Sequence, residues 1–160
     1  MRSLTPVEAA LCIAVGGSVL AVGIPAFVRD LHASRLVEPI DGLNRVAAAA
    51  AAQVQKGGLK VYPESAPRTP REVPVGAPAL DPPGVWEHPT WVSLGLSFSR
   101  PHSYSFEFQS DRRGRRSKYV AVARGDLDGD GQLSEFSIRG EVVDGHAPVT
   151  FPMEMRREVE

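Results

Sequence analysis

Cysteine is nearly absent from this chain of 160 residues, because Cys12 is its single example. A disulfide needs two cysteines, so no intrachain disulfide can stabilise the fold. An excess of one charge is also lacking: 18 Lys and Arg against 19 Asp and Glu leave a net charge of −1, which argues against nucleic acid as a partner. Aromatic residues make up 7% of the sequence, enough for one modest core.

Recognisable catalytic motifs are missing as well. The 4 histidines are scattered, and the sequence has no His-Glu-x-x-His, Gly-x-Ser-x-Gly or phosphate-binding loop. A cluster at Asp126–Asp130 has the acids to hold Mg²⁺ for phosphoryl chemistry, but no recognisable base or Lys/Arg clamp accompanies it. The sequence therefore predicts a protein that is not an enzyme.

A long apolar run, by contrast, is present near the N-terminus. From Ala9 to Val28 no side chain is ionisable except Cys12, and about 20 apolar residues in a helix cross the hydrocarbon core of a bilayer. A cleaved secretory signal has a basic n-region, a shorter core and a small-residue cleavage site, whereas here only Arg2 precedes the run and Arg29 follows it. We predict that this run is a single transmembrane segment.

One carboxylate, Glu8, stands at the start of this run. An acid at the edge of hydrocarbon costs several kcal/mol unless it is paired, hydrogen-bonded or protonated. In one interpretation, Glu8 lies at headgroup level as a solvated helix-start acid favoured by the helix dipole. In the other, it has a partner outside its own chain.

The segment Leu4-Thr5-Pro6-Val7-Glu8 resembles the start of type IV pilins and type II secretion pseudopilins. That family usually has an aromatic residue followed by Thr, two apolar residues and Glu. Counted from Leu4, Glu8 is fifth, Gly17 fourteenth and Pro25 twenty-second, which is the register of the family. Pro6 replaces a usually aliphatic residue, and proline is acceptable in the first turn of a helix.

This resemblance implies both processing and assembly. A prepilin peptidase would cut between Ser3, which stands where the family has Gly, and Leu4, and would methylate the new N-terminus. Glu8 would pair with the N-terminal amine of a neighbouring subunit, with Gly17 and Pro25 in the same assembly helix. The implied function is that of a structural subunit of a type IV pilus or a type II secretion pseudopilus. A monomeric, membrane-tethered, extracytoplasmic calcium-binding module is the alternative.

The predicted fold class is α+β, pilin-like, with one long kinked N-terminal helix, membrane-spanning in its first half, packed on a small antiparallel β-sheet head. The expected segments are a candidate leader (1–3), a transmembrane assembly helix (4–28) and an amphipathic continuation of that helix (29–56). A Pro-rich connecting loop (57–90) and a β head with an Asp-rich loop (91–160) are expected to follow.

An apolar stripe at alternating four- and three-residue steps continues the helix beyond the bilayer: Leu36, Ile40, Leu43, Ala47, Ala50 and Val54. Pro39 predicts a kink, and Gly57-Gly58 predicts the end of the helix. Eight prolines follow between Tyr62 and Pro89 without any helical or strand period. An extended connection with polyproline character is expected there.

From Trp91 the pattern predicts strands, with the last two weaker, at Trp91–Phe98, Tyr104–Phe108, Tyr119–Ala123, Phe136–Ile138, Val142-Val143 and Val149–Phe151. Tyr104, Phe106 and Phe108 alternate on one face, which is expected to meet the helix stripe. The segment 111–118 has five cations and predicts a solvated hairpin tip with Gly114 in the turn. Binding of DNA, anionic lipid or an acidic polymer is the alternative, without the stacking aromatics that favour nucleic acid.

An Asp-rich loop has acids at positions one, three and five and glycine at six, which resembles the first half of EF-hand and dockerin calcium loops. Position twelve is Ser137, so Glu135 would have to supply the last acid. The predicted Ca²⁺ ligands are Asp126, Asp128, Asp130, Gln132 through its carbonyl, and Glu135. The alternative is a plain hairpin in which the Asp-Gly pairs provide turn conformations.

Overall fold

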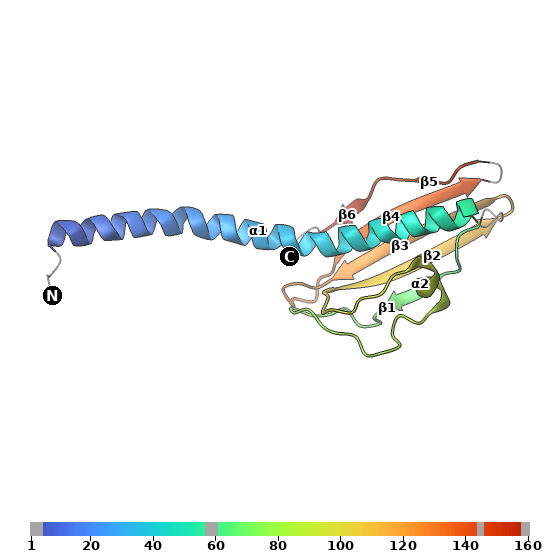
Figure 1. Cartoon of the computed structure of the whole chain (residues 1–160), viewed down its shortest axis with the longest axis horizontal. Coiled ribbons are helices and arrows are strands. Elements are labelled where there is room, and N and C mark those ends of the chain that lie inside the picture. The colour runs from blue at the N-terminus through green and yellow to red at the C-terminus, as the bar shows by residue number, and fades with distance from the viewer. Residues whose placement is uncertain (1–4, 57–60, 144–145, 158–160) are drawn as a thin grey trace. The chain divides into compact units, whose positions relative to one another are not determined.

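The computed structural model describes residues 5–56, 61–143 and 146–157, without the side chains of residues 26–35 and 56. The chain forms two compact units, residues 1–36 and residues 37–160, and the second is called the head. Figure 1 shows the elements in chain order: α1 (Pro6–Lys56), β1 (Ala66–Thr69), α2 (Pro89–Leu94), β2 (Tyr104–Arg113), β3 (Arg116–Gly125), β4 (Ser134–Val143), β5 (Val149–Thr150) and β6 (Glu154–Arg156). The α+β fold class, with an N-terminal helix and an antiparallel sheet, is confirmed.

Helix α1 begins at Pro6, where the missing proline N–H would have no intrahelical acceptor. Its segment Pro6–Pro25 has a mean hydropathy of 2.1 over 20 residues, and none of it is buried. It is thus long and apolar enough to span a membrane, a property that it shares with signal sequences. The helix is assigned without a break through Pro39, and the kink predicted there stays a prediction. The stop predicted at Gly57-Gly58 lies outside the described residues.

The sheet of the head is antiparallel, with strand order β1-β2-β3-β4-β5 and with β6 also paired to β4. Strands β2 and β3 pair over ten residues each, from Tyr104↔Gly125 to Arg113↔Arg116. Gly114 has φ 59 in the tight turn between them, a conformation that glycine adopts without steric cost. The predicted hairpin with Gly114 in its turn is therefore confirmed.

One face of this sheet packs against the Val37–Lys56 part of α1. Tyr104, Phe106 and Phe108 are all at most 1% exposed, as alternation predicted. On the helix side the stripe residues Leu43, Ala47, Ala50 and Val54 are buried. A Cβ added at Gly42 would lie 2.6 Å from the Phe106 ring, so glycine lets the helix backbone come close to that ring.

The strand predicted at Trp91–Phe98 is wrong, because α2 occupies Pro89–Leu94. Proline stands in its first turn, the His88 Nδ1 accepts the Thr90 N–H at 3.3 Å, and Gly95 with φ 64 ends the helix. Trp91 and Leu94, three residues apart, are both buried, so the apolar pattern has helical spacing. Local capping residues thus decide this segment.

Within the Pro-rich connection the structure has a short strand, β1, which the sequence did not predict. Its Ala66 pairs with Phe108 and its Thr69 with Phe106 of β2. Pro67 is tolerated because β1 is at the edge of the sheet, where one side of the strand needs no ladder hydrogen bond. The Trp91 Nε1–H donates to Thr69 Oγ1 at 2.8 Å and fastens α2 to this edge.

Candidate functional site

The first candidate site is the acid at the start of α1. The backbone N–H and the hydroxyl of Thr5 both donate to Glu8 Oε2, each at 2.8 Å. In return Thr5 Oγ1 accepts the Glu8 backbone N–H at 3.3 Å. This is a capping box, in which the residue before the helix and the third helical residue satisfy each other's free amides. The contact favours a helix-start role for Glu8, and Glu8 Oε1 takes part in none of these bonds.

Gly17 and Pro25, the other two residues of the predicted assembly register, both lie in α1. A Cβ added at Gly17 would have no neighbour within 4 Å. Apolar side chains of this segment, such as Val7 and Leu11, are exposed. Ser3 and Leu4, the predicted cleavage site, lie outside the described residues. The N-terminal unit therefore presents an apolar helical surface that the described part of its own chain does not cover.

The second candidate site is the loop between β3 and β4. One carboxylate oxygen from each of Asp126, Asp128 and Asp130 lies within 4.8 Å of the others. Asp126 is 4% exposed, and its two carboxylate oxygens accept the N–H groups of Gly129 at 2.8 Å and Gly131 at 3.2 Å. Both glycines have positive φ, which folds the loop back over Asp126. The cluster of three acids that the sequence predicted is therefore present in the structure.

The remaining two acids of the loop are held by similar local bonds. Asp128 Oδ1 accepts the Asp130 N–H at 3.1 Å. Asp130 accepts the backbone N–H of Gln132 at 2.7 Å and its side-chain amide N–H at 2.8 Å. Such turns place hard oxygen donors side by side, and this chemistry suits a divalent cation such as Ca²⁺. The carbonyl ligand predicted from Gln132 stays a prediction.

Glu135 is not part of this cluster, and its role as a ligand stays a prediction. Strand β4 begins at Ser134, so Glu135 is already part of the sheet and is paired with Arg124 of β3. Its Oε2 accepts from Arg124 Nε at 3.0 Å, while Arg124 Nη1 donates to Glu107 Oε2 at 2.6 Å. The register of the strands thus commits this acid to an ion pair on the sheet.

The Glu107–Arg124 pair predicts a pH dependence of stability. Burial alone would raise the pKa of Glu107, but hydrogen bonds from Gln109 and Arg124 outweigh it and hold the pKa below its usual value. A carboxyl whose pKa folding lowers stabilises the fold above its unfolded-state pKa, and this stability is lost as the pH falls through the folded-state value. Glu107→Gln is expected to cost about 1 kcal/mol near neutral pH and less in acid.

Urea unfolding of the full chain in detergent, at pH values from neutral to about 3, measures this difference. Glu64→Gln is the matched control, because Glu64 is an exposed acid of the connection. An equal effect of Glu107→Gln at every pH would contradict the assignment.

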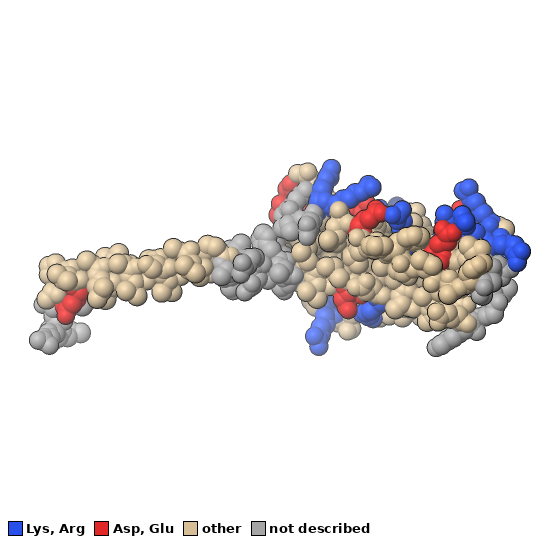
Figure 2. Space-filling model, turned by 90° about the horizontal axis from the view of Figure 1, so that it is seen from above, with Lys and Arg blue, Asp and Glu red and all other residues tan. Residues whose placement is uncertain are grey.

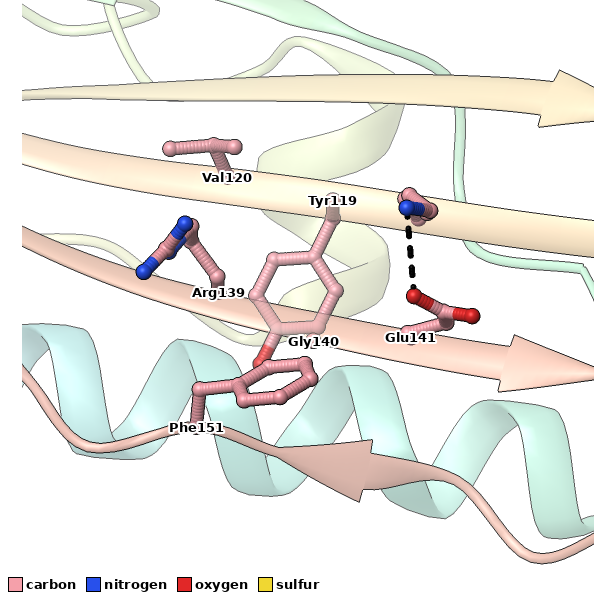
Figure 3. A pocket seen from close by; sticks show the side chains of 7 residues that line it. Tyr119, Val120, Arg139, Gly140, Glu141 and Phe151 are labelled. Carbon is pink, nitrogen blue, oxygen red and sulfur yellow. Dashed lines mark ion pairs between the residues drawn. The ribbon is translucent and has the colours of Figure 1, made fainter.

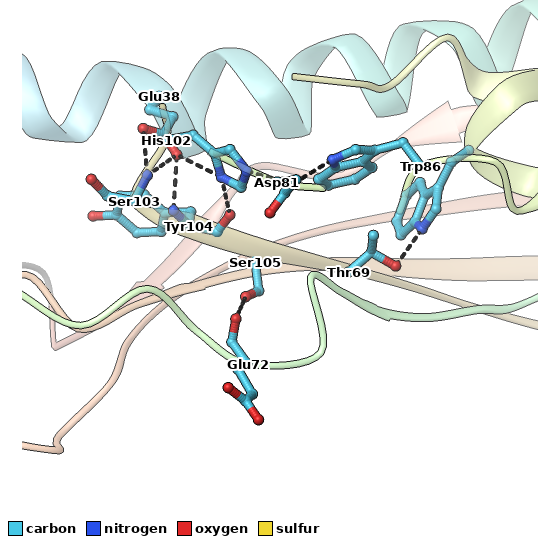
Figure 4. Close-up of polar contacts among 10 residues, drawn as sticks. Glu38, Thr69, Glu72, Asp81, Trp86, His102, Ser103, Tyr104 and Ser105 are labelled. Carbon is cyan, nitrogen blue, oxygen red and sulfur yellow. Dashed lines mark hydrogen bonds and ion pairs between the residues drawn. The ribbon is translucent and has the colours of Figure 1, made fainter. Parts of the chain in front are cut away.

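Sequence reasoning missed a buried polar network that joins the connection to the sheet (Figure 4). His102 is 2% exposed; its Nδ1 lies 2.9 Å from the Tyr104 carbonyl oxygen and its Nε2 lies 2.7 Å from Asp81 Oδ2. The Trp86 Nε1–H donates to the same Asp81 oxygen at 2.6 Å. Each ring nitrogen of His102 therefore faces an oxygen acceptor, the carbonyl of Tyr104 or the carboxylate of Asp81.

Glu38 of α1 borders this network and binds the start of β2. Its carboxylate accepts the backbone N–H of Ser103 at 3.0 Å and that of Tyr104 at 2.9 Å. Burial raises the pKa of Glu38, and these two amides together with His102 offset part of that rise. No signal in the sequence links Glu38, Asp81 and His102, because they are far apart in the chain. Their contacts join α1, the Pro-rich connection and the segment that leads into β2.

A hollow of about 340 Å³ lies over β3 and β4 (Figure 3). Tyr119, Gly140 and Phe151 line it, and its cations are already paired: Arg139 with Glu154, and Lys118 Nζ with Glu141 Oε2 at 3.2 Å. None of the residues that line this hollow is a Ser, Cys or His.

Together these features define a protein with an apolar N-terminal helix and an α+β head that carries an acidic loop. Comparison with protein-family models, curated proteins and solved structures finds no match for this chain.

Proposed function

We propose that this protein is a pilin-like structural subunit that assembles through its N-terminal helix into a type IV pilus or a type II secretion pseudopilus. The observation that supports this most is the apolar Pro6–Pro25 segment, none of which is buried, with one acid at its start. An uncovered apolar helix is stable in lipid or against other apolar helices. Glu8, Gly17 and Pro25 stand in the pilin register within it.

In this proposal the protein resides in the inner membrane with its head extracytoplasmic. Prepilin peptidase removes residues 1–3, and Leu4 becomes the first residue. Thr5 then keeps its backbone N–H, so the capping box with Glu8 is compatible with processing. Glu8 Oε1 is the oxygen that would accept the N-terminal amine of a neighbouring subunit. An ion pair in a low-dielectric environment is strong enough to select the correct register between helices.

The proposal predicts that Glu8→Ala abolishes incorporation into filaments and leaves membrane insertion intact. The reason is that the variant loses the acceptor for the neighbour's amine while the apolar helix is unchanged. Immunoblots of sheared filaments and of membranes, with the intact mass of the membrane form to detect loss of residues 1–3, measure both properties.

Thr5→Ala is the matched control, because it disrupts the capping box but keeps the Glu8 carboxylate. Thr5→Ala should cost about 1 kcal/mol at the helix start and still assemble. Normal incorporation of Glu8→Ala would sink the assembly role and favour the monomeric, membrane-tethered module.

The Asp126, Asp128 and Asp130 carboxylates support a second proposal, a Ca²⁺ site in the head. The three acids fit a hard cation, and Gln132 adds an oxygen ligand in the predicted scheme. With Glu135 engaged by Arg124, the site lacks the bidentate acid of an EF-hand, so binding should be weak. The loop also contacts the Pro-rich connection, since the Gly76 N–H donates to the Asp126 carbonyl at 2.8 Å.

Millimolar Ca²⁺ is therefore expected to stabilise the head by about 1 kcal/mol, a rise of a few degrees in Tm. Thermal unfolding of the full chain with Ca²⁺ and with chelator measures this shift. Asp128→Asn should remove most of the shift with little effect in chelator, because Asp128 is exposed. Identical midpoints with Ca²⁺ and chelator would argue for the plain hairpin.

A further inference from the structure

The buried contact between His102 and Asp81, called the His102–Asp81 pair, holds part of the Pro-rich connection on the head (Figure 4). Asp81 belongs to the connection, and His102 lies in the segment before β2. Ala79 and His102 also exchange two backbone hydrogen bonds of 2.9 Å each. The Trp86 Nε1–H donates to the same Asp81 oxygen that faces the ring. These contacts hold residues 79–86 against the segment that leads into the sheet.

The geometry of the His102–Asp81 pair sets the number of protons that it contains. The Tyr104 carbonyl can only accept, so His102 Nδ1, which lies 2.9 Å from it, carries a hydrogen. The 2.7 Å distance between Nε2 and Asp81 Oδ2 also requires a hydrogen between these two atoms, on the nitrogen or on the oxygen. With either placement the pair contains two protons. A separate ionised carboxylate and neutral imidazole contain one, so the pair in the folded head has one proton more.

The surroundings of the ring are those that stabilise a positive charge. The ring stacks on Phe98 with centroids 4.6 Å apart, and the Trp86 ring lies at 6.0 Å. The charged groups that face it are Asp81 from the connection and Glu38 from α1, whose Oε1 is 3.9 Å from His102 Nδ1. Among the described residues, no Lys or Arg is paired with any of these three groups. Figure 2 shows Lys and Arg at the surface of the head, where water screens their charge.

We propose that the His102–Asp81 pair is a pH-sensitive contact, which holds residues 79–86 in place while it contains two protons and releases them when one proton is lost to solvent. After that loss, a nitrogen lone pair and a carboxylate oxygen face each other at 2.7 Å and repel. The two side chains are 2% and 7% exposed, so little water can reach them to bridge the gap. Strands β2, β3 and β4 keep their backbone hydrogen bonds, so the release is local. The proposal concerns the head alone and does not depend on assembly of the chain.

The proton count sets the sign of the pH dependence. An unfolded histidine loses its proton near pH 6.5, so above that pH the held segment binds one proton more than the released segment, and the contact weakens as the pH rises. The lowered pKa of Glu107 acts in more acidic solution, and the raised pKa values of Tyr62 and Tyr119 act in more alkaline solution. Burial raises the pKa of Glu38, which gives the same sign but begins at a lower pH. The range from pH 6.5 to 8.5 is therefore the one that tests the pair.

Hydrogen exchange of the full chain in detergent, measured by mass spectrometry, follows the release directly. After correction for intrinsic exchange rates, the protection of residues 79–86 should fall several-fold between pH 6.5 and 8.5, with about tenfold per pH unit as the upper limit, while β2 and β3 keep theirs. Asp81→Asn should remove this pH dependence, because an amide donates to a neutral ring nitrogen and accepts from a protonated one. Glu87→Gln is the matched control and should retain the fall, since Glu87 is an exposed acid of the same connection.

Either of two results would overturn the proposal. Equal protection of residues 79–86 at pH 6.5 and pH 8.5 would show that the contact does not depend on a proton. An unchanged fall in Asp81→Asn would assign the pH dependence to other groups, such as Glu38 or His88. Nitrogen NMR of the histidine rings needs no variant and serves where Asp81→Asn does not fold. His102 Nε2 should have the chemical shift of a protonated or strongly hydrogen-bonded nitrogen at pH 6.5, and a bare Nε2 at that pH would contradict the proton count.

Discussion

Asp81→Ala is expected to destabilise the head by about 3 kcal/mol, because a buried donor left without its acceptor costs roughly 1–3 kcal/mol and two donors lose theirs. Asp81 and His102 are 7% and 2% exposed in their side chains. One carboxylate oxygen of Asp81 accepts from both His102 Nε2 and Trp86 Nε1. The alanine variant therefore leaves two buried donors without an acceptor, and water has little access to replace it.

Chemical unfolding of the full chain in detergent, followed by tryptophan fluorescence, measures this loss. Asp81→Asn should cost much less, because its amide oxygen can still accept from both donors. Glu87→Ala is the control, since Glu87 is an exposed acid of the same connection and should change the free energy of unfolding by less than about 0.5 kcal/mol. If Asp81→Ala behaved like Glu87→Ala, the network would have no role in stability.

Gly140→Ala is expected to destabilise the head by roughly 3 kcal/mol, at the upper end of the usual cost of overpacking. A Cβ at Gly140 would lie 2.2 Å from Tyr119 Cε1 and 2.8 Å from Cζ of the same ring. The ring cannot easily move, because it stacks on Phe108 at 5.2 Å and meets the edge of Tyr62 at 4.7 Å. The strain must therefore spread into the sheet or the aromatic cluster.

A double-mutant cycle with Tyr119→Leu separates this clash from a general effect of alanine on the strand. Without the aromatic ring, Gly140→Ala should cost much less, and the coupling between the two changes should exceed about 1 kcal/mol. Ser137→Ala on the same strand is the control for backbone position. Additive effects of Gly140→Ala and Tyr119→Leu would show that the ring is not the cause.

The sequence was most informative where local pattern and final packing agree. Alternating aromatics placed Tyr104, Phe106 and Phe108 on the buried face, and the turn glycine Gly114 placed the hairpin. It was least informative where local signals compete. The edge strand β1 was not predicted because its segment is rich in proline. The apolar residues of α2 were predicted as a strand, although Pro89 and Gly95 mark the ends of a six-residue helix.

The candidate sites divide in the same way. The three acids at Asp126–Asp130 are adjacent in the chain, so their spacing predicted their cluster. Glu135 lies only five residues further along the chain, but the β3–β4 register places it opposite Arg124, with which it forms an ion pair. The Asp81–His102 contact joins residues 21 positions apart, and no periodicity or turn signal in the sequence predicts it.

By itself, the sequence determined the apolar N-terminal helix with its single acid, the sheet of alternating aromatics and the clustered aspartates. Each of these depends on residues that are neighbours along the chain or on one face of an element. The tertiary structure alone decided which acids are free for a ligand and which polar groups are buried together. It also decided at which positions a side chain would clash with a neighbouring ring, as at Gly42 and Gly140. These properties depend on strand register and on contacts between distant segments, which a local pattern does not specify.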